Sequence, residues 1–147
     1  MEFFYFEILT TRIGENLPQE SMSHKAPVHN DYAYQLALTA AHCADDRQGA
    51  DIVILALEGL TVLTDYFVII TGFSRAQVRA IARHIEEQVL AKFSRQPLRT
   101  SGELEANWIV QDFGEVIVHI MQAKEREFYA LESFWGHAPK FILTKSA

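Results

Sequence analysis

The sequence predicts an α/β protein of the α+β kind, with a mixed β-sheet flanked by helices. Two unbroken apolar runs, residues 52–57 and 66–71, are typical of strands that are covered on both faces. One helical pattern precedes these runs and a second follows them. β-branched runs on either side of Asp112-Phe113-Gly114 predict a β-hairpin. Elements in this order need a sheet with helices packed against it.

The composition indicates one ordinary globular domain. The chain has 147 residues, which is enough for a sizeable single core, and 49% of them are hydrophobic and 22% charged. The 19 acidic and 13 basic residues leave a formal charge of −6. Broad contact with nucleic acid needs clustered Lys and Arg. This balance therefore disfavours direct nucleic-acid recognition and favours a basic protein surface as the partner.

Residue counts exclude several kinds of site. Cys43 is the single cysteine, which rules out an internal disulfide and a cysteine-based zinc site. His42, His84 and His119 are too scattered for a histidine pair on one helix, so no metal and no cofactor are expected. No run of 18 apolar residues is present, so no membrane span is expected. The opening residues lack the basic region of a signal peptide.

Three segments are expected along the chain. Residues 1–29 form an N-terminal extension that is expected to be irregular, because Gly14, Pro18 and Pro27 break any period. Within it, residues 3–9 fit a short strand or helix. Residues 30–140 form the single domain, and residues 141–147 form a C-terminal tail.

The first helix is expected to run to about residue 45, before Gly49. Either Asn30 or Asp31 can cap its start. Its apolar stripe is expected to contain Tyr34, Leu38 and Ala41, with Tyr32 and Leu36 as further members.

Ser74 opens the clearest helical pattern of the chain, and Gln77 three residues later completes a capping box. A glycine and a hydroxyl at a helix start, here beside Arg75 and Arg79, can hold a phosphate. Only one glycine is present, and there is no Lys-Ser/Thr pair of the P-loop kind, so an ordinary capped helix is favoured. The predicted buried stripe comprises Val78, Ile81, Ala82, Ile85, Val89 and Phe93.

The remaining elements follow Pro97. Residues 98–101 fit a short strand, the hairpin comes next, and residues 124–134 form the last helix, which Gly136 and Pro139 stop. The side of this helix that is expected to be buried carries Phe128, Leu131 and Phe134 or Trp135.

Two registers are open for the hairpin. If Phe113 and Gly114 form a two-residue loop, Trp108 lies opposite His119 and shares a face with Val110, Asp112, Glu115 and Ile117. If Gly114 closes a three-residue loop with a bulge, Trp108 faces Val118. Phe fits poorly where a mirror-image turn needs a positive φ, which favours the bulged form.

Trp108 is the leading candidate for function. A tryptophan on a strand is usually core, yet tryptophan is also enriched as an interface anchor, and the residues alone favour neither. His119 on the facing strand is either a partner contact or a satisfied, half-buried residue. The strand-end carboxylates of Asp51, Asp65 and Asp112 include no Asp-x-Asp pair, so turn roles are favoured over a two-metal site.

A string of spaced motifs resembles the Iojap-type ribosomal silencing factors. The likeness covers roughly residues 31–139. It is carried by residues 65–69, 71–74 and 80–81, by Trp108 with residues 112–114 and 118–119, and by residues 126–129, 131–132 and 135–136.

This resemblance implies a protein without catalytic activity. Such proteins bind a protein of the large ribosomal subunit, stop the small subunit from joining and so repress translation. Their fold is similar to that of nucleotidyltransferases but lacks the catalytic carboxylates. The family's partner-contacting tryptophan matches Trp108. The surrounding motif adds Asp112, Gly114 and His119 as partner-binding candidates. The closing helix motif adds Arg126, Glu132 and Trp135, and the resemblance fits a structural role for these three as well as a role in partner binding.

Three further expectations complete this interpretation. The location is expected to be cytoplasmic, with a plastid left open, and the hairpin is a possible homodimer interface. The alternative function is that of a degenerate nucleotidyltransferase-like nucleotide-binding protein. It would act through Asp65 and Asp112, with the helix start at Ser74.

Overall fold

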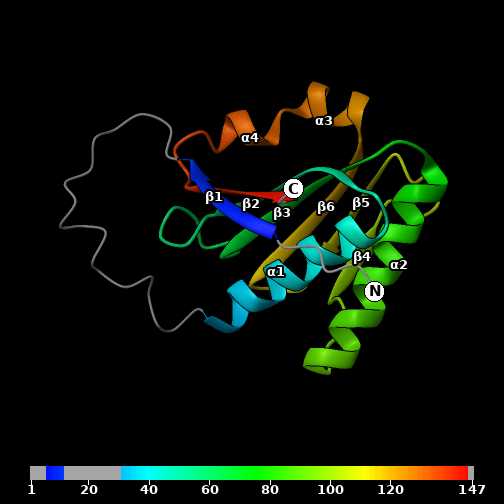
Figure 1. The fold of residues 1–147 in the computed structure, drawn as a ribbon, viewed down its shortest axis with the longest axis horizontal. Coiled ribbons are helices and arrows are strands. Elements are labelled where there is room, and N and C mark those ends of the chain that lie inside the picture. The colour runs from blue at the N-terminus through cyan, green and yellow to red at the C-terminus, as the bar shows by residue number, and fades with distance from the viewer. Residues whose placement is uncertain (1–5, 12–30, 146–147) are drawn as a thin grey trace.

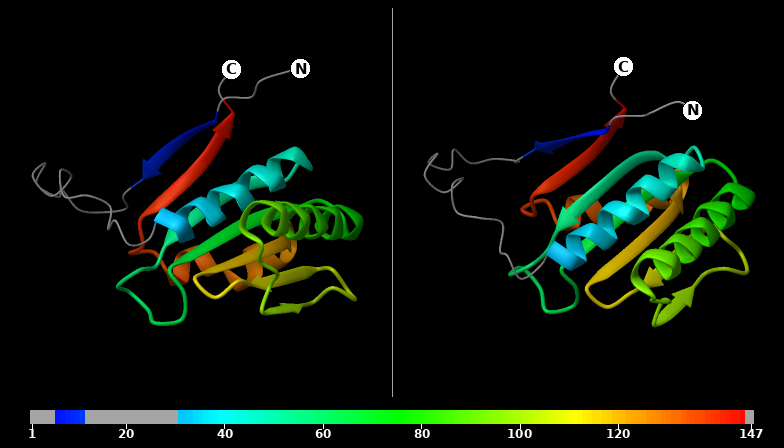
Figure 2. Two further views of the ribbon diagram at one scale, coloured as in Figure 1. Left: turned by 90° about the horizontal axis from the view of Figure 1, so that it is seen from below. Right: turned by 60° about the horizontal axis from the view of Figure 1, so that its bottom comes forward.

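A computed structural model describes residues 6–11 and 31–145 as a mixed sheet between two layers of helices (Figures 1 and 2). The seven strands lie in the order β1-β7-β2-β3-β6-β5-β4, and only the β3–β6 pair is parallel. This confirms the predicted mixed sheet flanked by helices. The strands are β1 (Phe6–Thr11), β2 (Ala50–Ala56), β3 (Tyr66–Gly72), β4 (Arg99–Ser101), β5 (Trp108–Asp112), β6 (Val116–Gln122) and β7 (Lys140–Lys145).

Helices cover both faces of the sheet. The long helices α1 (Asp31–Asp46) and α2 (Arg75–Phe93) lie side by side on one face, as Figure 2 shows. The short helices α3 (Ala123–Tyr129) and α4 (Leu131–Phe134) lie on the other face, at the top of Figure 1. Among the described residues, no helix combines the length and apolar character that a bilayer crossing requires.

The central strand β3 is buried along its whole length, as its apolar run predicted. The chain between β3 and its parallel neighbour β6 contains α2, β4 and β5, and α2 supplies the crossover that a parallel pair requires. The predicted cap of α2 is confirmed: the Ser74 hydroxyl accepts a hydrogen bond from the Gln77 N–H at 3.0 Å, and the Gln77 side chain accepts one from the Phe73 N–H at 2.7 Å. The Ser74 hydroxyl is therefore engaged in capping the helix.

Two hydrophobic cores result, one on each face of the sheet. The larger core lies between the sheet and α1 and α2. The smaller core holds Phe67, Ile69 and Met121 against Leu131 and Trp135 from the α4 side. The predicted stripe of α2 is confirmed from Val78 to Val89, while Phe93 is partly buried at its end.

The stripe predicted for α1 is only partly correct. Leu36 and Ala41 are buried, but Tyr34 and Leu38 pack at the edge of the core and Tyr32 is exposed. The helix lies against both the sheet and α2 and needs a wide face of small side chains, which close packing favours. That face comprises Ala33, Ala37, Ala40, Cys43 and Ala44.

The ends of the chain differ from the prediction. Residues 140–145, most of them expected to be a tail, form β7, which pairs with β2 through Val53 and Ile142. Residues 6–11 form β1, which pairs antiparallel with β7; of the strand and helix considered for residues 3–9, the strand is the one that agrees, within an extension otherwise expected to be irregular. The chain around Gly14, Pro18 and Pro27 lies outside the described residues. Periodicity over six residues is too short to separate a strand from a tail without knowledge of its neighbours.

The single helix expected over residues 124–134 is also wrong. It breaks at Ala130, which adopts a left-handed φ of 46° and separates α3 from α4. Neither glycine nor proline marks this break in the sequence. The break changes the helical phase, so Leu131 and Trp135 pack on the smaller core, whereas Phe128 and Phe134 are 79% and 77% exposed.

The hairpin adopts neither of the two registers considered. Trp108 lies opposite Met121, and Val110 lies opposite His119. The Phe113 N–H donates to the Val116 carbonyl at 2.9 Å, which leaves Gly114 and Glu115 as the two-residue loop. Phe113 is fully buried and so belongs to the core.

Both hairpin predictions failed because they placed Phe113 in the loop. The favoured bulged form is wrong, and the two-residue form is off by two residues. The two-residue form was still correct in placing Trp108 and His119 on one face, because a shift of two residues preserves the alternation of side chains.

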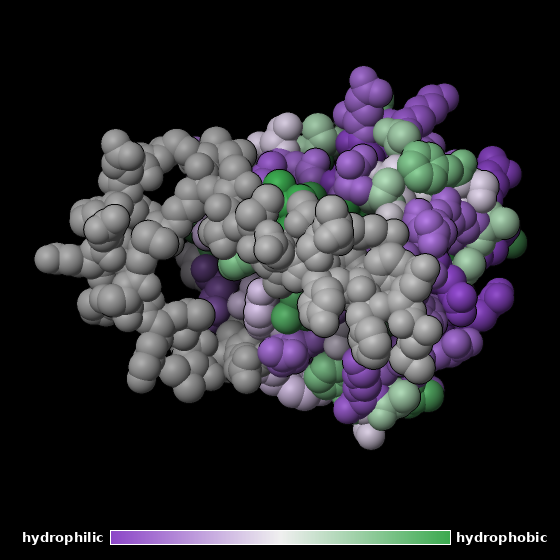
Figure 3. Space-filling model, in the orientation of Figure 1, coloured by the Kyte–Doolittle hydropathy of each residue, from purple (hydrophilic) through white to green (hydrophobic). Residues whose placement is uncertain are grey.

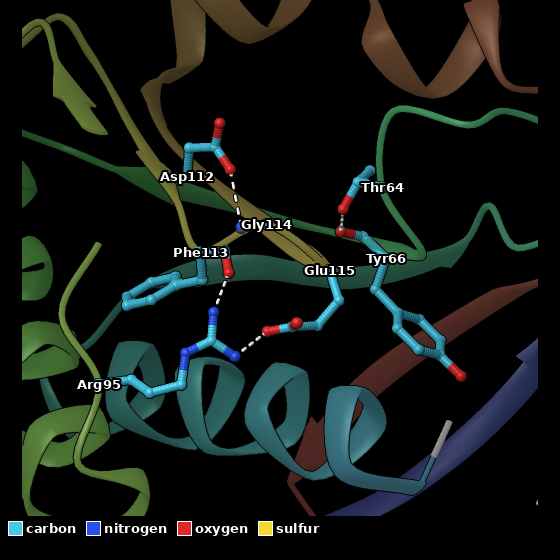
Figure 4. Close-up of polar contacts among 7 residues, drawn as sticks. All are labelled: Thr64, Tyr66, Arg95, Asp112, Phe113, Gly114 and Glu115. Carbon is cyan, nitrogen blue, oxygen red and sulfur yellow. Dashed lines mark hydrogen bonds and ion pairs between the residues drawn. The ribbon is translucent and has the colours of Figure 1, made fainter. Parts of the chain in front are cut away.

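Polar contacts fix this turn (Figure 4). The Asp112 carboxylate accepts the Gly114 N–H at 2.8 Å, and Gly114 has a φ of 94°, as the first position of such a loop requires. The guanidinium of Arg95, which follows α2, donates to the Glu115 carboxylate and to the Phe113 carbonyl. The turn is therefore tied to the helical layer.

Gly102 offers a test of how tightly β5 is held in the sheet. Its φ is 85°, and an added Cβ would lie 2.0 Å from the carbonyl oxygen of Trp108. Gly102→Ala is expected to lower the free energy of unfolding by roughly 2 kcal/mol or more, because backbone must move in addition to the strain of a positive φ. Urea denaturation measures this change.

Gly114→Ala is the matched control. Its φ is also positive, but an added Cβ would meet only ordinary contact with Leu98 at 3.5 Å. We expect a loss of about 1 kcal/mol, from backbone strain alone. Equal losses for the two variants would show that the loop before β5 is free to move away from Trp108.

Candidate partner-binding site

Trp108 lies at the start of β5 on the face covered by α3 and α4. Its side chain is half-buried. The indole Nε1–H donates a hydrogen bond to Nδ1 of His119 at 3.1 Å. On another side, the Tyr129 ring packs on the indole with 4.7 Å between ring centroids and 48° between the planes. The indole is thus held in place while part of it remains accessible to a partner.

His119 lies beneath the site and is only 6% exposed. Its ring packs edge-on against Phe67, with centroids 4.5 Å apart. Burial lowers the pKa of His119 to about 4, so the imidazole is neutral at neutral pH. A side chain this deeply buried offers little area to a partner, so of the two roles open to it the structure favours support of Trp108 over direct contact.

Trp135 belongs to the smaller core. It is half-buried and packs edge-on against Phe67, with centroids 6.3 Å apart and planes at 89°. Of the two roles open to it, the structure favours the structural one. Its neighbour Phe134 is the side chain that projects into solvent.

Arg126 and Glu132 join the two short helices to the sheet. The Arg126 guanidinium donates to the Thr71 hydroxyl at 2.8 Å and pairs with the Glu132 carboxylate at 2.5 Å. Both side chains line a pocket of about 390 Å³ between α3, α4 and the end of β3. Thr71 pairs with Met121, and Met121 pairs with Trp108. The Thr71 hydroxyl that holds Arg126 therefore lies in the same row of the sheet as Trp108.

Asp112 and Gly114 lie at the opposite end of β5. Four residues of strand separate Asp112 from Trp108, which corresponds to roughly 13 Å. Their mutual hydrogen bond forms the turn. The predicted site residues therefore fall into two groups. Trp108, His119, Arg126 and Glu132 gather near one end of the sheet. Trp135 packs on Phe67, which pairs with Ile117 in the row that also holds Asp112, so Trp135 lies toward the other end with Asp112 and Gly114.

Two further residues near Trp108 were missed by the sequence analysis as surface candidates. Tyr129 is 52% exposed, and Phe128 contacts it edge-on, with centroids 5.0 Å apart. Trp108, Tyr129 and Phe128 form a continuous row of rings, here called the aromatic surface. In Figure 3, a few hydrophobic side chains in green lie among the hydrophilic purple ones at the upper right of the molecule. The assumption of one unbroken helix placed Phe128 inside, and no sequence signal marked the break.

The alternative nucleotide-binding residues do not converge. Asp65 precedes β3 and Ser74 follows it, so the length of the strand, roughly 20 Å, separates them. Asp112 is engaged in its turn and Ser74 in its cap. Within residues 31–145, no group of three His, Cys, Asp or Glu side chains is placed to hold a metal ion.

Comparisons with known proteins identify relatives of this chain. The model of the family "Ribosomal silencing factor during starvation" matches residues 30–146. The chain is 42% identical over 104 residues to the ribosomal silencing factor of Bacillus subtilis, covering 71% of this chain and 86% of that protein. It is 37% identical over 103 residues to the chloroplastic protein Iojap of Zea mays, covering 69% of this chain and 44% of that protein.

Solved structures show the same fold. A crystal structure of a Chromobacterium violaceum protein matches with a TM-score of 0.67 and 29% identity, covering 70% of this chain and 85% of that one. One from Bacillus halodurans matches with a TM-score of 0.60 and 33% identity, covering 72% and 95%. The matched segment contains α1 to α4 and β2 to β7, and so includes the aromatic surface. With this match, this protein belongs to the ribosomal silencing factor family, as its Iojap-type motifs predicted.

Proposed function

We propose that this protein binds a protein of the large ribosomal subunit through the aromatic surface and prevents the small subunit from joining, which represses translation. The proposal extends the family membership to a site on this chain. Members of the family are binding factors and not enzymes. The observation that carries the proposal is a tryptophan that is held in one orientation by its neighbours and yet half accessible.

The geometry of Trp108 supports a role as an anchor. Tryptophan is enriched among the few residues that supply most of the energy of a protein interface, and such residues lie in the centre of a patch. Tyr129 and Phe128 extend the apolar area beside Trp108. Exposed aromatic residues that adjoin one another are typical of interaction sites.

The charges favour a protein partner with a basic surface over RNA. The whole chain has a formal charge of −6. Around the aromatic surface, α3 and α4 carry Glu125, Glu127 and Glu132 against Lys124 and Arg126, and Arg126 is already paired with Glu132. On α3 and α4 the two basic side chains are outnumbered by carboxylates, whereas contact with phosphate backbone requires clustered lysines and arginines.

The location of the protein is a further part of the proposal. We propose a cytoplasmic location, with a plastid as the alternative, since relatives include bacterial silencing factors and chloroplastic Iojap proteins. A relative from Mus musculus, 30% identical over 87 residues, is named "Mitochondrial assembly of ribosomal large subunit protein 1".

For the nucleotidyltransferase likeness we propose a similarity of sheet architecture only, supported by the mixed sheet with helices on both faces.

Trp108→Ala is expected to weaken binding to isolated bacterial large ribosomal subunits by about thirtyfold or more, because removal of an interface anchor typically costs about 2 kcal/mol or more. Co-sedimentation over a range of subunit concentrations measures this loss. The control is Leu90→Ala, which removes an exposed apolar side chain from α2 on the opposite face of the sheet. Equal binding of Trp108→Ala and the parent protein would remove Trp108 from the interface.

Phe128→Ala tests how far the surface extends. Because the Phe128 side chain is 79% exposed, its loss should change the free energy of unfolding by no more than about 0.5 kcal/mol. Binding to large subunits should fall by about three- to tenfold, as expected for a contact beside an anchor. A melting temperature and a binding curve on the same preparation separate the two effects. Unchanged binding would confine the interface to Trp108 and Tyr129.

A homodimer that uses the hairpin face would bury the same aromatic rings. We therefore expect self-association to compete with subunit binding. Light scattering across a concentration series should show any dimer dissociating in Trp108→Ala but not in Leu90→Ala. A dimer that persists in Trp108→Ala would place its interface elsewhere.

A further inference from the structure

The hydrogen bond between Trp108 and His119 defines where the imidazole carries its proton. An indole nitrogen can only donate, so Nδ1 of His119, 3.1 Å away, must present its lone pair. The ring proton of the neutral imidazole is therefore on Nε2. The other neutral tautomer, and the imidazolium, would place an N–H against the indole N–H and break the bond.

The same tautomer leaves a buried donor unsatisfied. Nε2 of His119 is inaccessible to solvent and has no hydrogen-bond partner among the described residues. A buried donor without a partner destabilises a fold, and an apolar side chain beside Phe67 would avoid that cost. Among the described residues, the bond to Trp108 is the only hydrogen bond of this imidazole. The one polar contact that the imidazole makes among the described residues is therefore the hydrogen bond that it accepts from the indole.

The positions of the two residues in the sheet explain why His119 can reach the indole. Trp108 pairs with Met121, and His119 lies two residues before Met121 on β6, so both side chains emerge on the same face as a diagonal pair. Tyr129 reaches the indole from α3. The ring is thus flanked by a packing contact from one layer and a hydrogen bond from another.

We propose that His119 is a positioning residue that locks the Trp108 indole in its binding orientation through the Nε1–H to Nδ1 hydrogen bond. This inference rests on the proposed function, since it assigns to His119 a role in presenting the anchor. An anchor that is rigid before binding loses less side-chain entropy on association and so binds more tightly.

Two substitutions of His119 separate the hydrogen bond from packing. His119→Leu keeps an apolar side chain against Phe67 but removes the acceptor, whereas His119→Asn loses ring packing but keeps an acceptor near the position of Nδ1. We expect His119→Leu to bind large subunits about three- to tenfold more weakly than His119→Asn, although its melting temperature is the higher of the two. If affinity instead follows melting temperature, His119 is a packing residue and the proposal fails.

NMR of the free protein gives a readout that needs no partner. The chain has two tryptophans, so the indole N–H of Trp135 serves as an internal reference for that of Trp108. In His119→Leu, hydrogen exchange at the Trp108 indole should accelerate at least severalfold, while exchange at the Trp135 indole, which packs on Phe67 and Phe134 rather than on His119, should change much less. In the parent protein, the imidazole ¹⁵N shifts should report a proton on Nε2. A proton on Nδ1, or unchanged exchange in His119→Leu, would overturn the proposal even if a His119 variant binds poorly.

A double-mutant cycle with Trp108→Phe completes the test. This variant keeps an aromatic ring but has no N–H, so adding His119→Leu to it should cost no further affinity for large subunits. Independent losses from the two substitutions would contradict the proposal. If Trp108→Ala binds as well as the parent protein, the proposed function fails instead, and the NMR experiment still decides whether His119 positions the indole.

Discussion

Burial of β3 on both faces is the constraint on which the rest of the structure depends. Every residue of this strand is buried, so the sheet must be covered on each side. The long helices α1 and α2 cover one face over β2, β3, β6 and β5. On the other face the described chain has only the short helices α3 and α4, and these shield Phe67 and Ile69 on β3 and Met121 on β6. Trp108, on the next strand, is left half-covered as a direct result.

This uneven cover defines the character of the candidate site. On the well-covered face, the sheet contributes a conventional core of aliphatic side chains. On the other face, rings from three strands and two helices contact one another, from Trp135 through Phe67 and His119 to Trp108 and Tyr129. The buried rings of this series are thus in contact with the rings that are accessible at the surface. A contact made at the surface is therefore supported by groups that also hold α3 and α4 on the sheet.

Much of this arrangement could be predicted from local pattern. The two buried strands, the capped start of α2 and its stripe depend on neighbours within a few residues, and they were predicted correctly. The hairpin register failed because Phe113 is buried in the larger core, which sequence spacing does not reveal. The break at Ala130 failed for a related reason: an alanine in the left-handed region is held there by the packing of Leu131 and Trp135 on the sheet. β7 is stabilised by strands far away in the sequence.

The pairing of β1 with β7 has a consequence for how the fold is completed. These are the first and last described strands, and β1 lies outside the matched family segment, which begins at residue 30. A chain emerges from synthesis N-terminus first, and contacts between distant segments carry the largest loop-closure cost. Strands β2 to β6 can pair with one another before β7, the only described neighbour of β1, has been made. The outer edge of the sheet, where β1 joins β7, therefore closes only after residues 140–145 have been made.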